Sequence, residues 1–386
     1  MSTHPTSRDL FLSFLRLGST AFGGPAMVAH IREMAVSRRG WLDEQTFKNG
    51  VALCQSIPGA TAIQTAAYVG LKSGGITGAL ASYVGFGLPA FLFMLIFSIL
   101  YARYNALPEI GSLFAGLQVI VVAIILNAVY TFGKGNIRNA ASLIISVLSA
   151  VLFWQGISPF VVVASAGLAG AILLQEVRPD SSHGRGDPKD IRREAGKIAV
   201  LGCILLVVLA GLYLANASLF ALAAVMLKID LFAFGGGFAS LPLMLHEIVM
   251  VKGWMASGTF MDGIALGQVT PGPIVITAAF VGYIVQGLAG AVAATIAIFT
   301  PSFFIVVAVA PIFDRLRSSP YFARAIEGIL ASFVGLLLFV FIKFALAVPW
   351  DVVRIILGLG ALVALIRKVD ILYIVPAGAV LSVLLL

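Results

Sequence analysis

The stretch Phe22-Gly23-Gly24-Pro25 returns 212 positions further along the chain as Phe234-Gly235-Gly236-Gly237. Both copies place helix-breaking residues inside long apolar segments. A lipid bilayer holds no water to satisfy the backbone groups that a break sets free, so breaks are tolerated mainly where they line a cavity in the protein. Corresponding breaks in two halves of one chain are typical of the binding site of a transporter.

A second broken motif follows each copy. Gln55-Ser56-Ile57-Pro58-Gly59 has its counterpart in Gln268-Val269-Thr270-Pro271-Gly272. The same register continues beyond the motifs and matches Gly70 with Gly282, Pro89 with Pro301, Arg103 with Arg315, Pro108 with Pro320, and Gly116 with Gly328. Chance does not hold one register over so long a stretch, so we interpret the chain as an internal duplication.

The composition is that of an integral membrane protein. Of 386 residues, 60% are hydrophobic and 11% are charged, whereas a soluble domain carries about 25% charged residues. The net charge of +8 comes from loops between apolar segments, which indicates membrane orientation rather than nucleic-acid binding.

The first apolar run lacks a small-residue cleavage site, so we expect no cleaved signal peptide. Cys54 and Cys203 stand in separate apolar segments with neither metal-site nor CxxC spacing. We expect both cysteines to be packing residues, with no metal and no cofactor.

The chain divides into two repeats. We predict a first transporter repeat over residues 1–175, a cytoplasmic linker over 176–197, a connector helix over 198–215 and a second repeat over 216–386. The connector has no counterpart in the first repeat, so it turns the second repeat upside down in the membrane. The predicted fold class is therefore an all-α polytopic membrane protein of two inverted-topology repeats with broken or re-entrant helices.

Basic loops orient the chain, with the N-terminus and linker in the cytoplasm, because most Lys and Arg of the short loops then fall inside. The loop from Arg32 to Lys48 is the exception. It lies outside if every segment spans, and inside if the first two segments of each repeat are re-entrant hairpins. Hairpins give about nine full spans plus four re-entrant segments, and full crossing gives about 13 segments. The charges favour the hairpins.

Two cations inside apolar segments are the main candidates for a binding site. Arg16 stands six residues before Phe22, and Lys228 stands six residues before Phe234, so the two are repeat-equivalent. Inverted repeats would bring them to the membrane midplane from opposite sides. A guanidinium fork and a compact ammonium suit a small divalent oxyanion. The alternative is that each side chain snorkels to a membrane interface.

The broken motifs would add neutral hydrogen-bond donors. Backbone that unwinds at glycine and then starts a new helix presents free N–H groups and a positive dipole end. Such donors form an anion cage without a full countercharge. The alternative is that these residues only kink packed helices. The predicted substrate-binding residues are Arg16, Gly23, Gly24, Pro25, Gln55, Ser56, Pro58, Gly59, Lys228, Gly235, Gly236, Gln268, Thr270, Pro271 and Gly272.

Two acidic residues are further candidates, for coupling transport to another ion. Asp230 stands two residues after Lys228 and would balance that lysine in an empty site, or carry a proton. Glu327 begins a segment where the first repeat has Ala115, so it is either a coupling group or an interfacial residue. No nucleotide-binding loop and no nucleophile motif occurs, so we expect no enzyme activity.

The doubled motifs resemble the chromate ion transporter family over nearly the whole chain. Leu15-Arg16-Leu17-Gly18 leading into Ala21-Phe22-Gly23-Gly24-Pro25 is similar to its first domain, and the second-half motifs are similar to the second domain of its long form. The resemblance implies export of chromate and resistance to it, with sulfate as a structural analogue. It attaches importance to Arg16, Gly23, Gly24 and Pro25. Gly237 stands where the pattern of Pro25 has proline, so the second glycine turn should be looser.

We therefore predict a secondary transporter that exports chromate across the cytoplasmic membrane. The rivals are a carrier or exchanger for sulfate or another oxyanion, an anion channel, and a membrane enzyme acting on a lipid phosphate. The enzyme would need a catalytic cluster near one membrane interface, and the sequence shows none. The expected partners are the oxyanion and the lipid bilayer. A homodimer is compatible with the sequence, which offers no surface for it.

Overall fold

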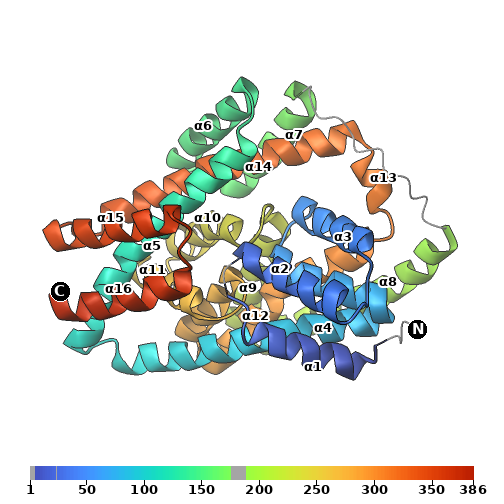
Figure 1. The fold of residues 1–386 in the computed structure, drawn as a ribbon, viewed down its shortest axis with the longest axis horizontal. Coiled ribbons are helices and arrows are strands. Elements are labelled where there is room, and N and C mark those ends of the chain that lie inside the picture. Colours follow the sequence, from blue (N-terminus) through green and yellow to red (C-terminus); the bar gives the residue numbers. More distant parts are fainter. Residues whose placement is uncertain (1–4, 23, 175–187) are drawn as a thin grey trace.

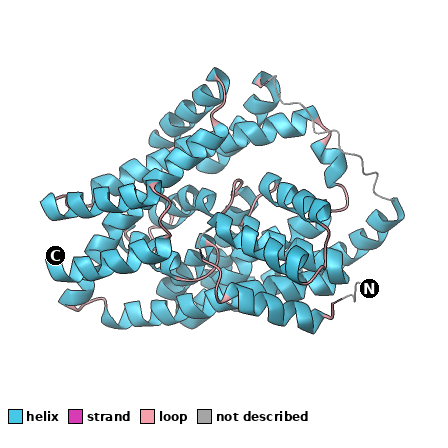
Figure 2. Cartoon of the chain, in the orientation of Figure 1, coloured by secondary structure: helices cyan, strands magenta, loops and turns pink. Residues whose placement is uncertain are grey.

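The computed structural model describes residues 5–22, 24–174 and 188–386. Figure 2 shows helices joined by loops throughout these residues. The one extended pairing among them is an isolated bridge between Pro58 and Phe234. The predicted all-α class is confirmed.

Helix length separates two groups of apolar helices. Four are long and apolar enough to cross a membrane, and they occupy Thr61–Tyr104, Pro108–Asn136, Ile274–Val309 and Pro320–Ala347. Six more apolar helices among the described residues have 10–17 residues, and one of them, Gly202–Ala215, is the end of the longer helix Pro188–Ala215. The polytopic prediction is confirmed.

The helices of the two halves follow the same order (Figure 1). The first half comprises α1 (Ser7–Gly18), α2 (Gly24–Arg32), the π-helix η1 (Glu33–Arg38), α3 (Glu44–Ser56), α4 (Thr61–Tyr104), α5 (Pro108–Asn136), α6 (Ala140–Trp154) and α7 (Pro159–Leu173). The second half comprises α9 (Ala217–Phe232), the 3-10 turn η2 (Gly237–Ala239), α10 (Ser240–Met244), the π-helix η3 (Leu245–Val251), α11 (Ser257–Val269), the 3-10 turn η4 (Ile274–Ile276), α12 (Thr277–Val309), α13 (Phe313–Arg317), α14 (Pro320–Ala347), α15 (Val352–Ile366) and α16 (Ile371–Leu385). Even the π-helical turn recurs 212 positions later, so the duplication extends to local backbone irregularities.

Both α4 and α12 are two antiparallel helices rather than one long rod. Their backbone angles leave the helical range at Gly74-Gly75 and at Gln286-Gly287. Across the first of these turns the hydroxyl of Ser82 donates to the carbonyl of Ala66 (2.8 Å). The turn separates two apolar segments, each of which becomes one arm of a helical hairpin.

The chain also folds back at the break after α3 and at its counterpart after α11. Gly50 of α3 lies against the ring of Tyr68 in α4, and Gly263 of α11 lies against the ring of Phe280 in α12. The missing side chains let the two arms of each hairpin approach closely. The second broken motif of each half therefore sits at the tip of a hairpin.

The first break of each half turns the chain in the same way. In the first half, the Trp41 ring, which follows η1, lies 6.5 Å from the Phe14 ring of α1. In the second half, Glu247 of η3 forms an ion pair with Lys228 of α9. In each half, the segments before and after the first break therefore lie side by side, as the hairpin alternative requires.

The outer helices are exchanged between the halves. α6 and α7 pack on α14 of the second half, and α15 and α16 pack on α5 of the first half. Small residues permit this packing, since Gly170 of α7 lies against Gly328 of α14, and Ser382 of α16 lies against Gly116 of α5. Figure 1 shows α6, α7 and α14 along the upper edge and α1 and α4 along the lower edge. The outer helices of each half are therefore packed against the other half.

The helix α8 (Pro188–Ala215) connects the halves and packs on α9 and α12. It begins ahead of the predicted connector at 198, inside the segment assigned to the linker. The rest of that linker, residues 175–187, lies outside the described residues. Large apolar side chains on α8 are exposed, among them Leu206, Val207 and Leu214. Such a surface suits contact with lipid tails.

Candidate functional site

The breaks of one half are hydrogen-bonded to the breaks of the other. The N–H of Gly59 donates to the carbonyl of Ala233 (2.9 Å), and the N–H of Gly272 donates to the carbonyl of Ala21 (3.1 Å). Ala21 and Ala233 are repeat-equivalent, as are Gly59 and Gly272, so the two bonds are counterparts. The first break of each half therefore contacts the second break of the other half. We call this pair of contacts the crossing.

This crossing requires glycine at its two centres. Gly59 and Gly272 have φ angles of +116° and +104°, a region that residues with a side chain rarely adopt. A Cβ atom on Gly59 would lie 2.5 Å from the amide nitrogen of Gln64, and one on Gly272 would lie 2.7 Å from the Cβ of Ala90. Both backbone angle and space therefore exclude other residues here.

New helices begin beside the crossing. α4 starts at Thr61, whose hydroxyl would lie 3.6 Å from a Cβ atom added to Gly236. η2 starts at Gly237, which lies against Ile274 at the start of η4. The first N–H groups of a helix have no partner inside it and carry the positive end of its dipole. These helix N-termini make the centre of the molecule favourable for an anion.

The glycine turn of the first break is fully described in the second half alone. Gly23 lies outside the described residues, and for Gly24 and Pro25 only the start of α2 is described. In the second half, Gly235 and Gly236 both have positive φ, and a 3-10 turn precedes α10. The second copy thus enters its helix through an extra turn.

The side chains of the second motifs divide into used and unused donors. The Ser56 hydroxyl donates to the carbonyl of Ala52 (2.8 Å), and the Thr270 hydroxyl donates to that of Gly267 (3.0 Å). Both hydroxyls are therefore engaged within their own helices. Gln55 is exposed, while the side-chain nitrogen of Gln268 is buried without a partner among the described residues. The Gln268 amide is therefore a buried donor that is available to a ligand.

The two predicted cations are treated differently. Arg16 is exposed on α1, and no ion pair engages it among the described residues. The Nζ of Lys228 lies 2.7 Å from Oε1 of Glu247 and 4.0 Å from the centre of the Phe160 ring. The helix of Arg16, α1, packs on α4, whereas the helix of Lys228, α9, packs on α12.

The sequence predicted that Asp230 would balance the charge of Lys228. In the structure, Glu247 forms the ion pair with Lys228 instead. The carboxylate of Asp230 is fully buried, and its Oδ2 accepts from the N–H (2.7 Å) and the hydroxyl (2.6 Å) of Ser302. Ser302 follows the proline inside α12 and its side chain faces Gly59. Asp230 therefore ties α9 to α12 beside the crossing. Its Oδ1 has no partner among the described residues.

Glu327 lies in the early turns of α14, half-buried, and none of the described contacts joins it to the breaks. Its coupling role stays a prediction.

A polar cluster outside the predicted site surrounds Asp262 of α11. Its carboxylate accepts from the hydroxyl of Tyr101 (2.8 Å) and from the side-chain amide of Gln118 (2.8 Å). The three residues line a cavity of about 230 Å³ between α4, α5 and α11. The signal in the sequence that could have found this cluster is an acidic residue near the start of an apolar segment. No group of three or more potential metal ligands occurs in the described part of the chain.

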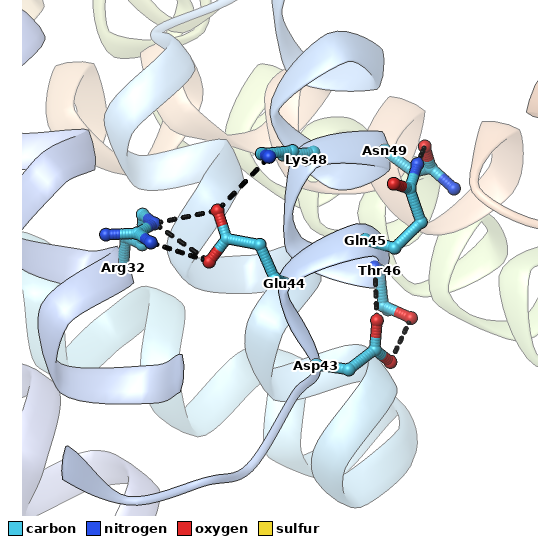
Figure 3. Close-up of polar contacts among 7 residues, drawn as sticks. All are labelled: Arg32, Asp43, Glu44, Gln45, Thr46, Lys48 and Asn49. Carbon is cyan, nitrogen blue, oxygen red and sulfur yellow. Dashed lines mark hydrogen bonds and ion pairs between the residues drawn. The ribbon is translucent and has the colours of Figure 1, made fainter. Parts of the chain in front are cut away.

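A polar network at the surface connects the end of α2 with the start of α3 (Figure 3). Arg32 forms an ion pair with Glu44 (2.8 Å), and Lys48 approaches the same carboxylate at 3.5 Å. Asp43 caps α3 by accepting from the N–H of Thr46 (2.8 Å). The hydrogen bond from Arg32 lowers the pKa of Glu44, and the bond from the Thr46 backbone lowers the pKa of Asp43. The network therefore joins the end of α2 to the first turns of α3.

Comparisons with known proteins give one consistent result. A family model described as chromate transporter matches residues 8–171 and again residues 220–383. An uncharacterized transporter of Methanocaldococcus jannaschii is 44% identical over 385 residues, which cover 99% of this chain and 95% of the relative. A chromate transport protein of Cupriavidus metallidurans is 32% identical, covering 86% of this chain and 80% of the relative.

A chromate transport protein of Pseudomonas aeruginosa is 30% identical, covering 85% of this chain and 79% of the relative. No solved structure was found to match the chain.

Proposed function

This chain belongs to the chromate transporter family, and from that premise we propose that it exports chromate across the cytoplasmic membrane and confers resistance to it. The N-terminus and the linker lie in the cytoplasm in this proposal. The single observation that carries it is the pair of crossed breaks, in which Gly59 and Gly272 bond to the opposite half. Helix N-termini gather there, as an oxyanion site requires.

The proposed site binds the anion mainly with neutral donors. Free N–H groups at the starts of α4, η2 and η4 surround the crossing, and the amide of Gln268 adds a donor with no other partner. Neutral donors stabilise a dianion in a water-poor site without creating a large positive charge in the empty protein. The full set of predicted binding residues, including Arg16 and the glycines, belongs to this proposal.

Arg16 supplies the free positive charge. Its guanidinium is exposed, and no ion pair among the described residues engages it, so an arriving oxyanion does not have to displace a carboxylate. A guanidinium fork also matches two oxygens of a tetrahedral oxyanion. We propose that Arg16 captures the anion and passes it to the crossed breaks.

The membrane potential is sufficient to drive export. A dianion leaving a cell that is negative inside gains about 4.6 kcal/mol per 100 mV, which corresponds to a gradient on the order of a thousandfold. Potential-driven uniport or exchange for another anion therefore requires no coupled proton. Asp230 is the group we propose for any proton that does travel, because its Oδ1 is buried without a partner.

Sulfate is the main alternative substrate, since it shares the charge and tetrahedral shape of chromate. Accumulation of chromate in everted vesicles, with and without excess sulfate, separates a chromate exporter from a general oxyanion carrier. Right-side-out vesicles test the direction of transport. A channel would instead give currents far above the turnover of a carrier.

The site is tested by Arg16→Ala, with Arg8→Ala on the same helix as the matched control. We expect Arg16→Ala to raise the KM for chromate at least about tenfold, the loss of one charge-assisted contact. Arg8→Ala should match wild type. Equal accumulation of chromate by both variants would remove Arg16 from the site.

A further inference from the structure

The second-half cation is already occupied by a carboxylate of the protein itself. Lys228 and Glu247 are joined at 2.7 Å, and the ring of Phe160 lies against the ammonium at 4.0 Å. The side chain of Lys228 is 47% exposed, whereas that of Glu247 is 7% exposed. The ammonium of Lys228 is therefore partly accessible although it is already paired with a buried carboxylate.

The first copy has no such carboxylate. Glu247 lies on η3, and the residue 212 positions earlier is Ala35 on η1, the matching π-helical turn. Ala35 is buried, and its cation, Arg16, is exposed. The backbone is repeated, but the acidic group is present in one copy alone. Two cations that are equivalent in the sequence therefore carry different amounts of available charge.

A carboxylate and an oxyanion compete for the same donors. The ammonium of lysine offers three N–H donors, and oxygens of either anion accept them in the same manner. Because Glu247 is buried, losing Lys228 would leave its charge uncompensated, which proteins strongly resist. An oxyanion that approaches Lys228 must therefore compete with the Glu247 carboxylate, whereas no described carboxylate is paired with Arg16.

We propose that Glu247 is an internal competitor for the transported divalent oxyanion at Lys228. The inference rests on the proposed function and deepens it. Glu247 lowers the affinity of the second-half cation and so speeds release of the anion there, while Arg16 does the capturing. The site is functionally asymmetric although the fold is duplicated.

A purely structural ion pair makes a different prediction. If Glu247 only holds η3 against α9, its removal destabilises the protein and leaves anion affinity unchanged or weaker. If Glu247 competes with the anion, its removal raises affinity and slows turnover, because release becomes harder. The split between KM and kcat therefore distinguishes the two roles.

The experiment compares Glu247→Gln with the conservative Glu247→Asp in purified protein and in vesicles, with chromate and sulfate as the anions. We expect Glu247→Gln to bind the anion about tenfold more tightly, the value of one charge-assisted bond, with a lower kcat. Glu247→Asp keeps a carboxylate beside Lys228, so it should bind the anion less tightly than Glu247→Gln. Unchanged or weaker binding in a Glu247→Gln protein that elutes like wild type would overturn the proposal.

The reciprocal variant Ala35→Glu places the carboxylate on the first copy. It should weaken anion binding about tenfold by occupying Arg16, and unchanged binding would count against the proposal. Glu247→Ala, which copies the first half, replaces Glu247→Gln if the latter does not accumulate. Failure of the proposed function looks different, since wild type itself would then not transport chromate.

Discussion

The two copies of the broken unit share a backbone and differ in how they treat charge. In the first copy Arg16 is exposed, and its helix ends at Gly18. In the second copy Lys228 is paired with Glu247, and Asp230, the counterpart of Gly18, is buried on Ser302. Duplication has kept the geometry that breaks and crosses the helices, while the ionisable groups have become specific to one half.

This difference teaches which features the architecture demands. The bonds from Gly59 to Ala233 and from Gly272 to Ala21 occur in both copies, so the crossing depends on the symmetric glycines. The acidic groups occur in one copy, so the fold does not require them at that position. Symmetric residues should therefore dominate stability, and asymmetric ones should tune transport.

The largest expected effect is on the crossing itself. Gly59→Ala and Gly272→Ala should each cost about 1–3 kcal/mol for the left-handed backbone. Overpacking should add about 1–3 kcal/mol, because the new methyl meets Ser302 and Gln64 at Gly59, or Ala90 at Gly272. Gly40→Ala is the matched control, because Gly40 also has positive φ (+59°) but open space around it. Thermal unfolding in detergent measures the difference. A Gly59→Ala protein as stable as Gly40→Ala would break the symmetric account of the crossing.

A smaller effect on stability is expected at the hydrogen bonds between Asp230 and Ser302, which occur in the second half alone. Asp230→Ala removes the acceptor of two donors on Ser302 and should destabilise the protein by about 2–4 kcal/mol, since a buried N–H loses its partner. Asp230→Asn keeps an acceptor and should lose less. If Asp230 also carries a proton, Asp230→Asn should abolish any effect of a pH gradient on chromate flux while leaving flux driven by potential. Equal melting temperatures for wild type and Asp230→Ala would exclude the tie.

The smallest effect belongs to the surface loop. The pKa of Glu44 is lowered by Arg32, so this pair stabilises the fold above the unfolded pKa of a glutamate, about 4.3, and the contribution is lost as pH falls through the lower folded value. Wild type should melt slightly above Arg32→Ala at pH 7. The difference should shrink below about pH 4. A difference that grows in acid would show that the pair does not act through the Glu44 carboxylate.

The sequence predicted the elements whose signals are local. Glycine and proline inside apolar runs located both breaks in each half, and a constant register paired Arg16 with Lys228. Both signals are read along the chain, because a break depends on backbone freedom at the residue itself.

Features that depend on contacts between distant segments were not predictable. The bond from Gly59 to Ala233 joins residues 174 positions apart, and nothing in either motif specifies its partner. The partner of Lys228 was missed because Glu247 borders a loop in the sequence, while Asp230 stands two residues away. On a helix, residues two apart do not face each other. The hairpin after α9 instead brings η3 back to the lysine.

The most direct test of the central claim is a structure of the protein with chromate bound. We expect density for one tetrahedral anion beside the crossed breaks, within hydrogen-bond distance of the amide of Gln268 and of free N–H groups at the starts of α4 or η4. Density for the anion in the cavity lined by Asp262, or at another place away from Gly59 and Gly272, would contradict the claim that the crossed breaks form the oxyanion site.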